Sequence, residues 1–177
     1  MFIYNHYLDG TCITHVWCGG DVCWMYSGKV RGKAPYLVTH MVQGAADDYS
    51  ISYDISRTDN GSHFRGVIVL HPRECVIPKG EAVEYTFFHR FCEEKPEDAP
   101  LAYEGAMRFT ADHYSLLAGE QVKLTLEGTF EECVKMSCGE ESIPFSVEDG
   151  KLTAYYTLNQ TGEYQFTVQA GDKKTWL

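Results

Sequence analysis

The sequence lacks the features of a membrane, nucleic-acid-binding or disordered protein. No apolar run among its 177 residues is long enough to cross a bilayer, and its first residues do not resemble a signal peptide. Basic residues are few, with 15 Lys and Arg against 25 Asp and Glu and a net charge of -10. Because nucleic acids and anionic lipids bind basic patches, we expect no nucleic acid and no membrane as partners.

Signatures of metal, redox and acid–base chemistry are missing as well. The 7 cysteines include no paired C-x2-C motif, so we expect no metal site and no cofactor. We expect these cysteines to be mostly reduced and buried, which favours a cytoplasmic location. No two carboxylates stand out as a pair that faces a cleft, so we assign no catalytic residues.

The stretch HVWCGGDVCWMYSGK, residues 15–29, comes nearest to a site motif. It contains Gly-Lys, but Cys23 and Val30 stand where a phosphate-binding loop needs a glycine and a hydroxyl. His15, Cys18 and Cys23 suggest metal ligands, but a strand directs alternate side chains to opposite faces, which argues against a shared metal.

We predict instead that this stretch is a hairpin, with one strand on each side of a Gly19-Gly20 turn. Its cysteines are then buried thiols, and a disulfide between Cys18 and Cys23 across the hairpin is the alternative. Trp17 and Trp24 flank the same turn, so we expect these two rings to pack against each other.

Turn signals recur through the first part of the chain about every ten residues, a spacing typical of sandwiches and barrels. They include DGT, CGGD, SGK, DNGS, HPRE and PKGE, with short apolar runs such as GVIVL between them. The segment CEEKPEDAPLAYEG is acidic and carries two prolines, which indicates a connection. We therefore predict an all-β chain with a boundary between residues 1–104 and 105–177.

Alternation is sharper after this boundary. The segments QVKLTLEG, KLTAYYTL and EYQFTVQA each place apolar residues on one face and mostly polar residues on the other. This pattern is typical of half-buried antiparallel strands. Tyr164 follows a Gly-x pair at the start of a late strand, where immunoglobulin-like domains carry a tyrosine corner. We predict two β-sandwich modules, of which the second is immunoglobulin-like.

Aromatic residues of the first module are the candidates for ligand binding. β-Sandwiches bind sugars through exposed rings, whose apolar faces stack on the C–H surface of a sugar. Trp17, Trp24, Tyr26 and Tyr36 are the residues that we would place in such a glycan platform. Aromatic residues are often buried, so the competing interpretation is that they belong to the core.

The first module also resembles a known family over about residues 3–95. The segments THVWCGGD, SGKVRGKAPYLVTHMVQGAADDYSI, RTDNGSHFRGVIVLHP and IPKGEAVEYTFFHRF are similar to the β-supersandwich region of six-hairpin-glycosidase-like proteins. The resemblance implies a carbohydrate-active context and suits an adjacent immunoglobulin-like domain of the bacterial type. The residues that carry it in structural roles are Gly19, Gly20, Arg65, Gly66, His71 and Pro72.

Together these observations predict a non-catalytic accessory segment of a carbohydrate-active, glycosidase-like protein. Its partners would be carbohydrate and either a catalytic domain of the parent protein or a second copy of the chain. Fold likeness alone does not transfer activity, so the parent protein is a glycoside hydrolase only by implication. Two alternatives remain open: a stand-alone glycan-binding module, and a structural or protein-interaction module without a ligand.

Overall fold

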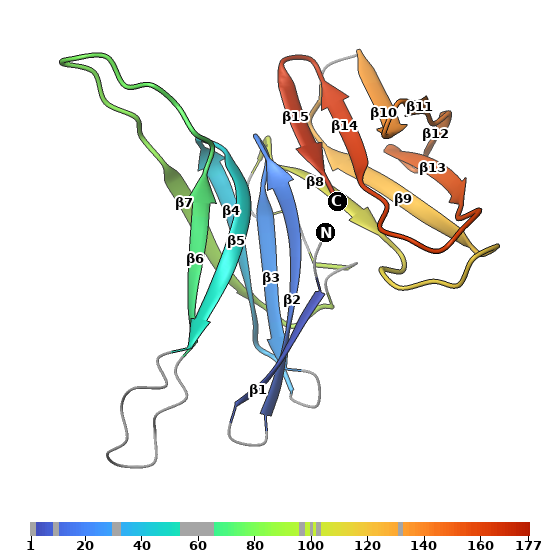
Figure 1. Ribbon diagram of the computed structural model, residues 1–177, viewed down its shortest axis with the longest axis horizontal. Helices are drawn as coiled ribbons and strands as arrows, with labels where there is room; N and C mark the ends of the chain where they lie inside the picture. Colours follow the sequence, from blue (N-terminus) through green and yellow to red (C-terminus); the bar gives the residue numbers. More distant parts are fainter. Residues whose placement is uncertain are drawn as a thin grey trace.

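The computed structural model describes residues 3–8, 11–29, 33–53, 66–95, 98–99, 101, 104–130 and 133–177; for 3–8, 11–16, 29, 51–53, 66–68 and 148 it describes only the backbone. Every regular element in this part of the chain is a strand, which confirms the all-β prediction (Figure 1). No described helix is long and apolar enough to span a membrane. The strands are β1 (Ile3–Leu8), β2 (Thr11–Gly20), β3 (Trp24–Lys29), β4 (Tyr36–Gln43), β5 (Ala46–Tyr53), β6 (Gly66–Pro72), β7 (Thr86–Cys92), β8 (Met107–Ala111), β9 (Gln121–Gly128), β10 (Val134–Cys138), β11 (Glu141–Ser142), β12 (Phe145–Glu148), β13 (Lys151–Thr157), β14 (Phe166–Ala170) and β15 (Lys173–Trp176).

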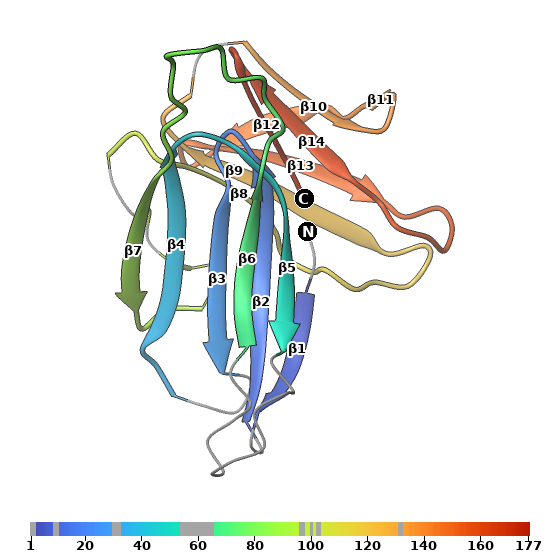
Figure 2. The same ribbon diagram turned by 60° about the vertical axis from the view of Figure 1, so that its left-hand side comes forward.

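The strands form two antiparallel sheets in a sandwich-like arrangement. The larger sheet runs in the order β11-β10-β14-β15-β2-β3-β4-β7, with β1 and β5 also paired to β2 and β6 paired to β5. The smaller sheet runs β12-β13-β9-β8. Figure 2 shows the strands of the first half standing side by side, with the strands of the second half crossing behind and beside them.

Period-two patterns explain the strands of the second half. In β9, Val122, Leu124 and Leu126 are buried, while the residues between them are exposed or half-buried. In β14, the residues Phe166 and Val168 are buried in the same alternating way. Each strand therefore buries one face in the sandwich and presents the other to solvent.

The two halves of the chain share their largest core. This core, here called the main core, joins Trp24 and Val38 of the first half to Phe109 and Leu124 of the second half. The indole N–H of Trp24 donates a hydrogen bond to the Phe109 carbonyl at 3.2 Å. The boundary predicted at 104/105 falls between β7 and β8, and packing continues across it.

The opposite face of β2, β3 and β4 has a separate, smaller core, here called the outer core. It contains Trp17, Met25 and Met41 from these strands, together with Ala46 and Tyr49 of β5. The β5–β6 pair covers this face, but β7 at the edge of the sheet stays exposed, since Phe91 there is 70% exposed. The main core is therefore closed by a whole sheet and the outer core by two strands.

Candidate functional site

The predicted glycan platform is not presented at the surface. Trp24 and Tyr26 lie in the main core with 1% and 4% of their surface exposed, and Tyr36 is half-buried against them. The Tyr26 and Tyr36 rings lie 5.5 Å apart. Trp17 is 2% exposed. Rings enclosed by protein on both faces cannot stack on a sugar, so the core interpretation describes Trp24 and Tyr26. Tyr36 is only partly covered, and Trp17 contributes to the wall of the cavity described below.

Trp17 and Trp24 do not pack against each other, contrary to the sequence-based expectation. Cys18 pairs with Trp24, and Trp17 pairs with Met25, so the two tryptophans lie on opposite faces of the sheet. A two-residue Gly19-Gly20 turn would have placed both on one face. The actual loop is longer, and an odd shift in register moves a side chain to the other face.

The glycines of the WCGG segment extend β2 beyond the hairpin pairing, and the turn itself follows at Asp21. Trp176 pairs with Gly19 and Thr175 with Gly20, which brings the last strand of the chain onto β2. A Cβ at Gly19 would lie 2.7 Å from the Trp176 indole nitrogen, and one at Gly20 would collide with the Lys174 carbonyl. Gly20 also has a φ of 104°. These glycines therefore allow the close approach of β15.

Of the remaining residues with predicted structural roles, those that the structure describes lie in β6. Gly66 begins β6 and pairs with Tyr53, while Pro72 ends this strand. His71 Nε2 lies 2.8 Å from the Ser50 hydroxyl. Arg65 lies outside the described residues.

Tyr164 makes local hydrogen bonds of the kind that a tyrosine corner requires. Its hydroxyl donates to the Gln160 carbonyl at 2.9 Å and accepts from the Gln160 N–H at 3.2 Å. The ring stacks near Phe166, with 6.4 Å between centroids. These hydrogen bonds thereby fix the conformation of the connection before β14.

Cysteines behave as predicted in the hairpin but not throughout the chain. Cys18 and Cys23 are free and buried, and burial raises the pKa of Cys18 to about 11 and that of Cys23 to about 12. Such thiols are protonated and unreactive at neutral pH. Cys75 and Cys133 are free and exposed, so the expectation of burial is wrong for these two.

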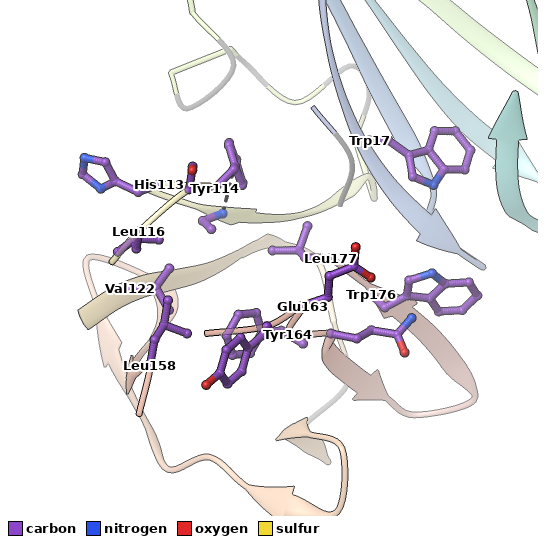
Figure 3. Close-up of a pocket in the computed structure, with 15 residues that line it drawn as sticks. Trp17, His113, Tyr114, Leu116, Val122, Leu158, Glu163, Tyr164, Trp176 and Leu177 are labelled. Carbon is purple, nitrogen blue, oxygen red and sulfur yellow. Dashed lines mark hydrogen bonds between the residues drawn. The ribbon is translucent and has the colours of Figure 1, made fainter. Parts of the chain in front are cut away.

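A cavity of about 630 Å³ lies where β15, the start of β14 and the β8–β9 connection meet (Figure 3). This is within the usual size range of small-molecule sites. Among the residues that line it are Trp17, Tyr114, Tyr164, Trp176, Leu158 and Leu177. Figure 3 shows that these side chains come from both halves of the chain.

The strand register explains why the larger sheet has a gap between β1 and β15 beside the cavity. On one edge of β2, β1 pairs up to Val16 and β15 pairs with Gly19 and Gly20. Trp17 and Cys18 lie between these two partners. The chain then leaves β15 at Leu177, whose backbone is paired with Phe166. The junction between the two strand partners therefore forms one wall of the cavity.

The walls of the cavity combine half-buried rings with polar groups at the mouth. Tyr114, Tyr164 and Trp176 are half-buried, while Ser115 and Gln165 are exposed. The Tyr114 hydroxyl accepts a hydrogen bond from the Ala111 N–H at 3.3 Å, drawn dashed in Figure 3. The Trp17 N–H is buried without a hydrogen-bond partner in the described structure, and the Trp17 side chain forms part of the cavity wall.

The charge at the cavity is negative. Glu163 lies at the exposed rim, and no described lining residue is Lys or Arg. Behind Trp176 stands Arg73, 5.9 Å from the ring centroid. This guanidinium is held by ion pairs with Asp21 at 2.7 Å and with Asp47 at 3.0 Å, so its charge is compensated.

Of the residues that line the cavity, the sequence indicated Trp17, as a candidate for a glycan platform, and Tyr164, in a structural role. It did not indicate Trp176 or Tyr114. Trp176 ends a short strand, and its sequence context gave no sign that this strand pairs with β2. Within the described residues, no group of three His, Cys, Asp or Glu side chains is arranged to hold a metal ion. The arrangement of rings and rim groups suits ligand binding.

Comparison with known proteins supports the fold. No family model matches the chain, and no curated protein matches its sequence. Among solved structures, a polysaccharide lyase is similar in fold, with a TM-score of 0.65 and 15% sequence identity. The similarity covers 98% of this chain and 32% of the lyase. The chain therefore has the fold of a β-rich region found in a carbohydrate-active enzyme, and it spans about a third of that enzyme's length.

Proposed function

We propose that this chain is a non-catalytic accessory β-sandwich segment of a larger carbohydrate-active protein, in which it positions a catalytic domain. The observation that carries the proposal is the unequal coverage, since the similarity takes in 98% of this chain and 32% of the lyase. A segment that matches part of a larger enzyme from end to end has the size of a supporting module.

The finer family assignment belongs to the same proposal. In this proposal residues 1–104 form a partial β-supersandwich of the six-hairpin-glycosidase-like type, and residues 105–177 form an immunoglobulin-like domain. The hydrogen bonds of Tyr164 support the second assignment, because a tyrosine corner is a hallmark of that fold. The free thiols of the described cysteines support a cytoplasmic location.

Strand β7 supplies a surface on which a catalytic domain can pack. It is the last strand of the larger sheet, and Phe87, Phe88 and Phe91 on it are 37%, 40% and 70% exposed. Exposed rings on an open sheet edge are unusual for a surface that faces only water, and they mark interaction sites. A catalytic domain of the same parent protein is the partner that the proposal requires.

The test is an activity assay on the purified chain. Incubated with a panel of neutral and acidic polysaccharides, it should release neither reducing ends nor unsaturated products that absorb in the ultraviolet. Turnover that is lost in Glu163→Gln or Asp47→Asn, with the fold intact by circular dichroism, would overturn the proposal. A coding region beside this chain that encodes repeated amphipathic helices would support it.

A second candidate function is a protein-interaction module that associates with itself through β7. The exposed phenylalanines favour it, since an open edge strand can pair with a second copy. Size-exclusion chromatography over a range of concentrations tests this candidate. A dimer that Phe91→Ser converts to a monomer would favour self-association over a catalytic-domain partner.

A further inference from the structure

We infer that the cavity lined by Trp17, Tyr114, Tyr164 and Trp176 binds an uncharged sugar unit of a glycan chain. The inference rests on the proposed function for the class of ligand, carbohydrate. It adds to that function the position of the site and the charge of the sugar.

The walls of the cavity suit the apolar face of a sugar. Tyr114, Tyr164 and Trp176 are half-buried, so each ring is fixed by protein on one side while part of it stays open. Tyr164 is held further by the two hydrogen bonds of its hydroxyl to Gln160. Rings fixed in this way lose little conformational freedom on binding, which favours affinity.

The mouth of the cavity suits the hydroxyl groups of a sugar. Ser115 and Gln165 are exposed there and offer a hydroxyl and an amide, each able both to donate and to accept a hydrogen bond. Apolar walls with a few polar groups at the opening are the usual composition of small-ligand sites.

The charge around the cavity selects against acidic sugars. Glu163 adds a negative charge at the rim, and the described lining contains no Lys or Arg to pair with a uronate or sulfate group. The imidazole in the lining, His113, lies 3.3 Å from the Asp112 carboxylate. Arg73 behind Trp176 is already paired with Asp21 and Asp47. The whole chain carries a net charge of -10, which also repels anions. An uncharged hexose or pentose unit is not subject to this repulsion.

Calorimetry with oligosaccharides of matched length tests the inference. The probes are cellohexaose, mannohexaose and xylohexaose as neutral ligands, and hexagalacturonate as the acidic ligand. At least one neutral probe should bind, with an affinity at least tenfold above that of hexagalacturonate. Trp176→Ala should reduce the neutral affinity at least tenfold. Gln165→Ala, an exposed change that leaves the core untouched, should reduce it severalfold.

A matched control is Phe91→Ala, which removes an exposed ring far from the cavity lining and should leave sugar affinity unchanged. Loss of binding in Phe91→Ala but not in Gln165→Ala or Trp176→Ala would overturn the position of the site. Tighter binding of hexagalacturonate would overturn the charge assignment. Binding of none of the probes would overturn the inference, whereas the accessory function fails by a different result, turnover of a polysaccharide by the chain.

Discussion

The two faces of the sheet formed by β2, β3 and β4 are covered by different parts of the fold. On one face, Trp24 and Val38 enter the main core and are covered by strands of the second half. On the other face, Trp17 and Met41 enter the outer core under β5 and β6. Trp24 donates its N–H to a carbonyl, whereas the Trp17 N–H is buried without a partner and its ring borders the cavity.

The cavity draws on both cores, so the two faces differ in how they are covered and not in whether they can contribute to binding. Long-range contacts between the two halves of the chain close the main core. The outer core is small and contributes Trp17 to the cavity, whereas Val122, Leu158, Phe166 and Leu177 of the cavity lining belong to the main core. We therefore expect substitutions of fully buried main-core residues to affect stability, and substitutions of exposed or half-buried residues at the cavity and on β7 to affect ligands and partners.

The largest effect should come from Trp24→Ala. Loss of this ring leaves a hole in the main core and an unpaired Phe109 carbonyl, which should lower the free energy of unfolding by about 3–5 kcal/mol. Trp17→Ala should cost less, because it also removes a buried N–H that has no partner. Urea unfolding of both variants measures the difference. An equal or larger loss in Trp17→Ala would contradict the contrast between the two faces.

Gly20→Ala should disrupt the pairing of β2 with β15. Its φ of 104° disfavours any side chain, and a Cβ there would collide with the Lys174 carbonyl of β15. We expect a loss of about 2–3 kcal/mol in the free energy of unfolding. Gly80→Ala is the matched control, because Gly80 has a φ of 92° with nothing near its Cβ position. Similar losses of unfolding free energy in the two variants would show that the close approach of β15 to Gly20 does not contribute to the loss.

Acid should weaken the main-core face through His40. Burial, and to a lesser extent the charge of Arg108, lower the pKa of His40 from 6.5 to about 4. In the unfolded chain this histidine takes up its proton near pH 6.5, so the stability that it contributes is complete above that pH. This stability falls as the pH drops towards 4, by on the order of 2 kcal/mol between pH 7 and pH 5.

The measurement for His40 is urea unfolding at pH 7 and pH 5 for the wild type and His40→Gln. Carboxylates titrate in both proteins, so the difference between the two pH dependences isolates the histidine. The wild type should lose more stability than the variant over this range. An identical loss in both would contradict the assignment of His40 as a neutral, buried group.

The smallest effect on stability should come from Phe91→Ser at the edge of the outer core. Phe91 is 70% exposed, so its removal should change the free energy of unfolding by less than about 0.5 kcal/mol. Binding of a hydrophobic dye such as ANS should decrease, because the change reduces the exposed apolar surface of β7. A loss of stability comparable to that of Trp24→Ala would show that β7 belongs to the closed part of the fold.

Much of the secondary structure of the second half could be predicted, because it depends on residues a few positions apart in the sequence. The alternation in QVKLTLEG gave the buried set of β9, and the Gly-x-Tyr pattern located the hydrogen bonds of Tyr164. The hairpin of the first half was predicted as well, but its turn was placed too early. With the turn misplaced, the prediction put Trp24 on the wrong face of the sheet, since neighbouring side chains in a strand point in opposite directions.

The cavity was not predictable in the same way. Trp176 and Tyr114 are separated from Trp17 by most of the chain, and only the pairing of β15 with β2 brings Trp176 close to it. The glycines at positions 19 and 20 were recognised as a turn signal. These glycines also allow β15 to approach β2 closely, and this role depends on a strand that the local sequence does not specify.

By itself, the sequence determined the strand class, the alternating faces of β9 and β14, and the acidic character of the chain. These properties depend on residues a few positions apart and on composition. Only the tertiary structure decided that Trp17 and Trp24 face different cores, that β15 joins β2, and that a cavity forms beside this junction. Such features depend on register and on pairing between distant segments, which is set by how the completed sheets pack together.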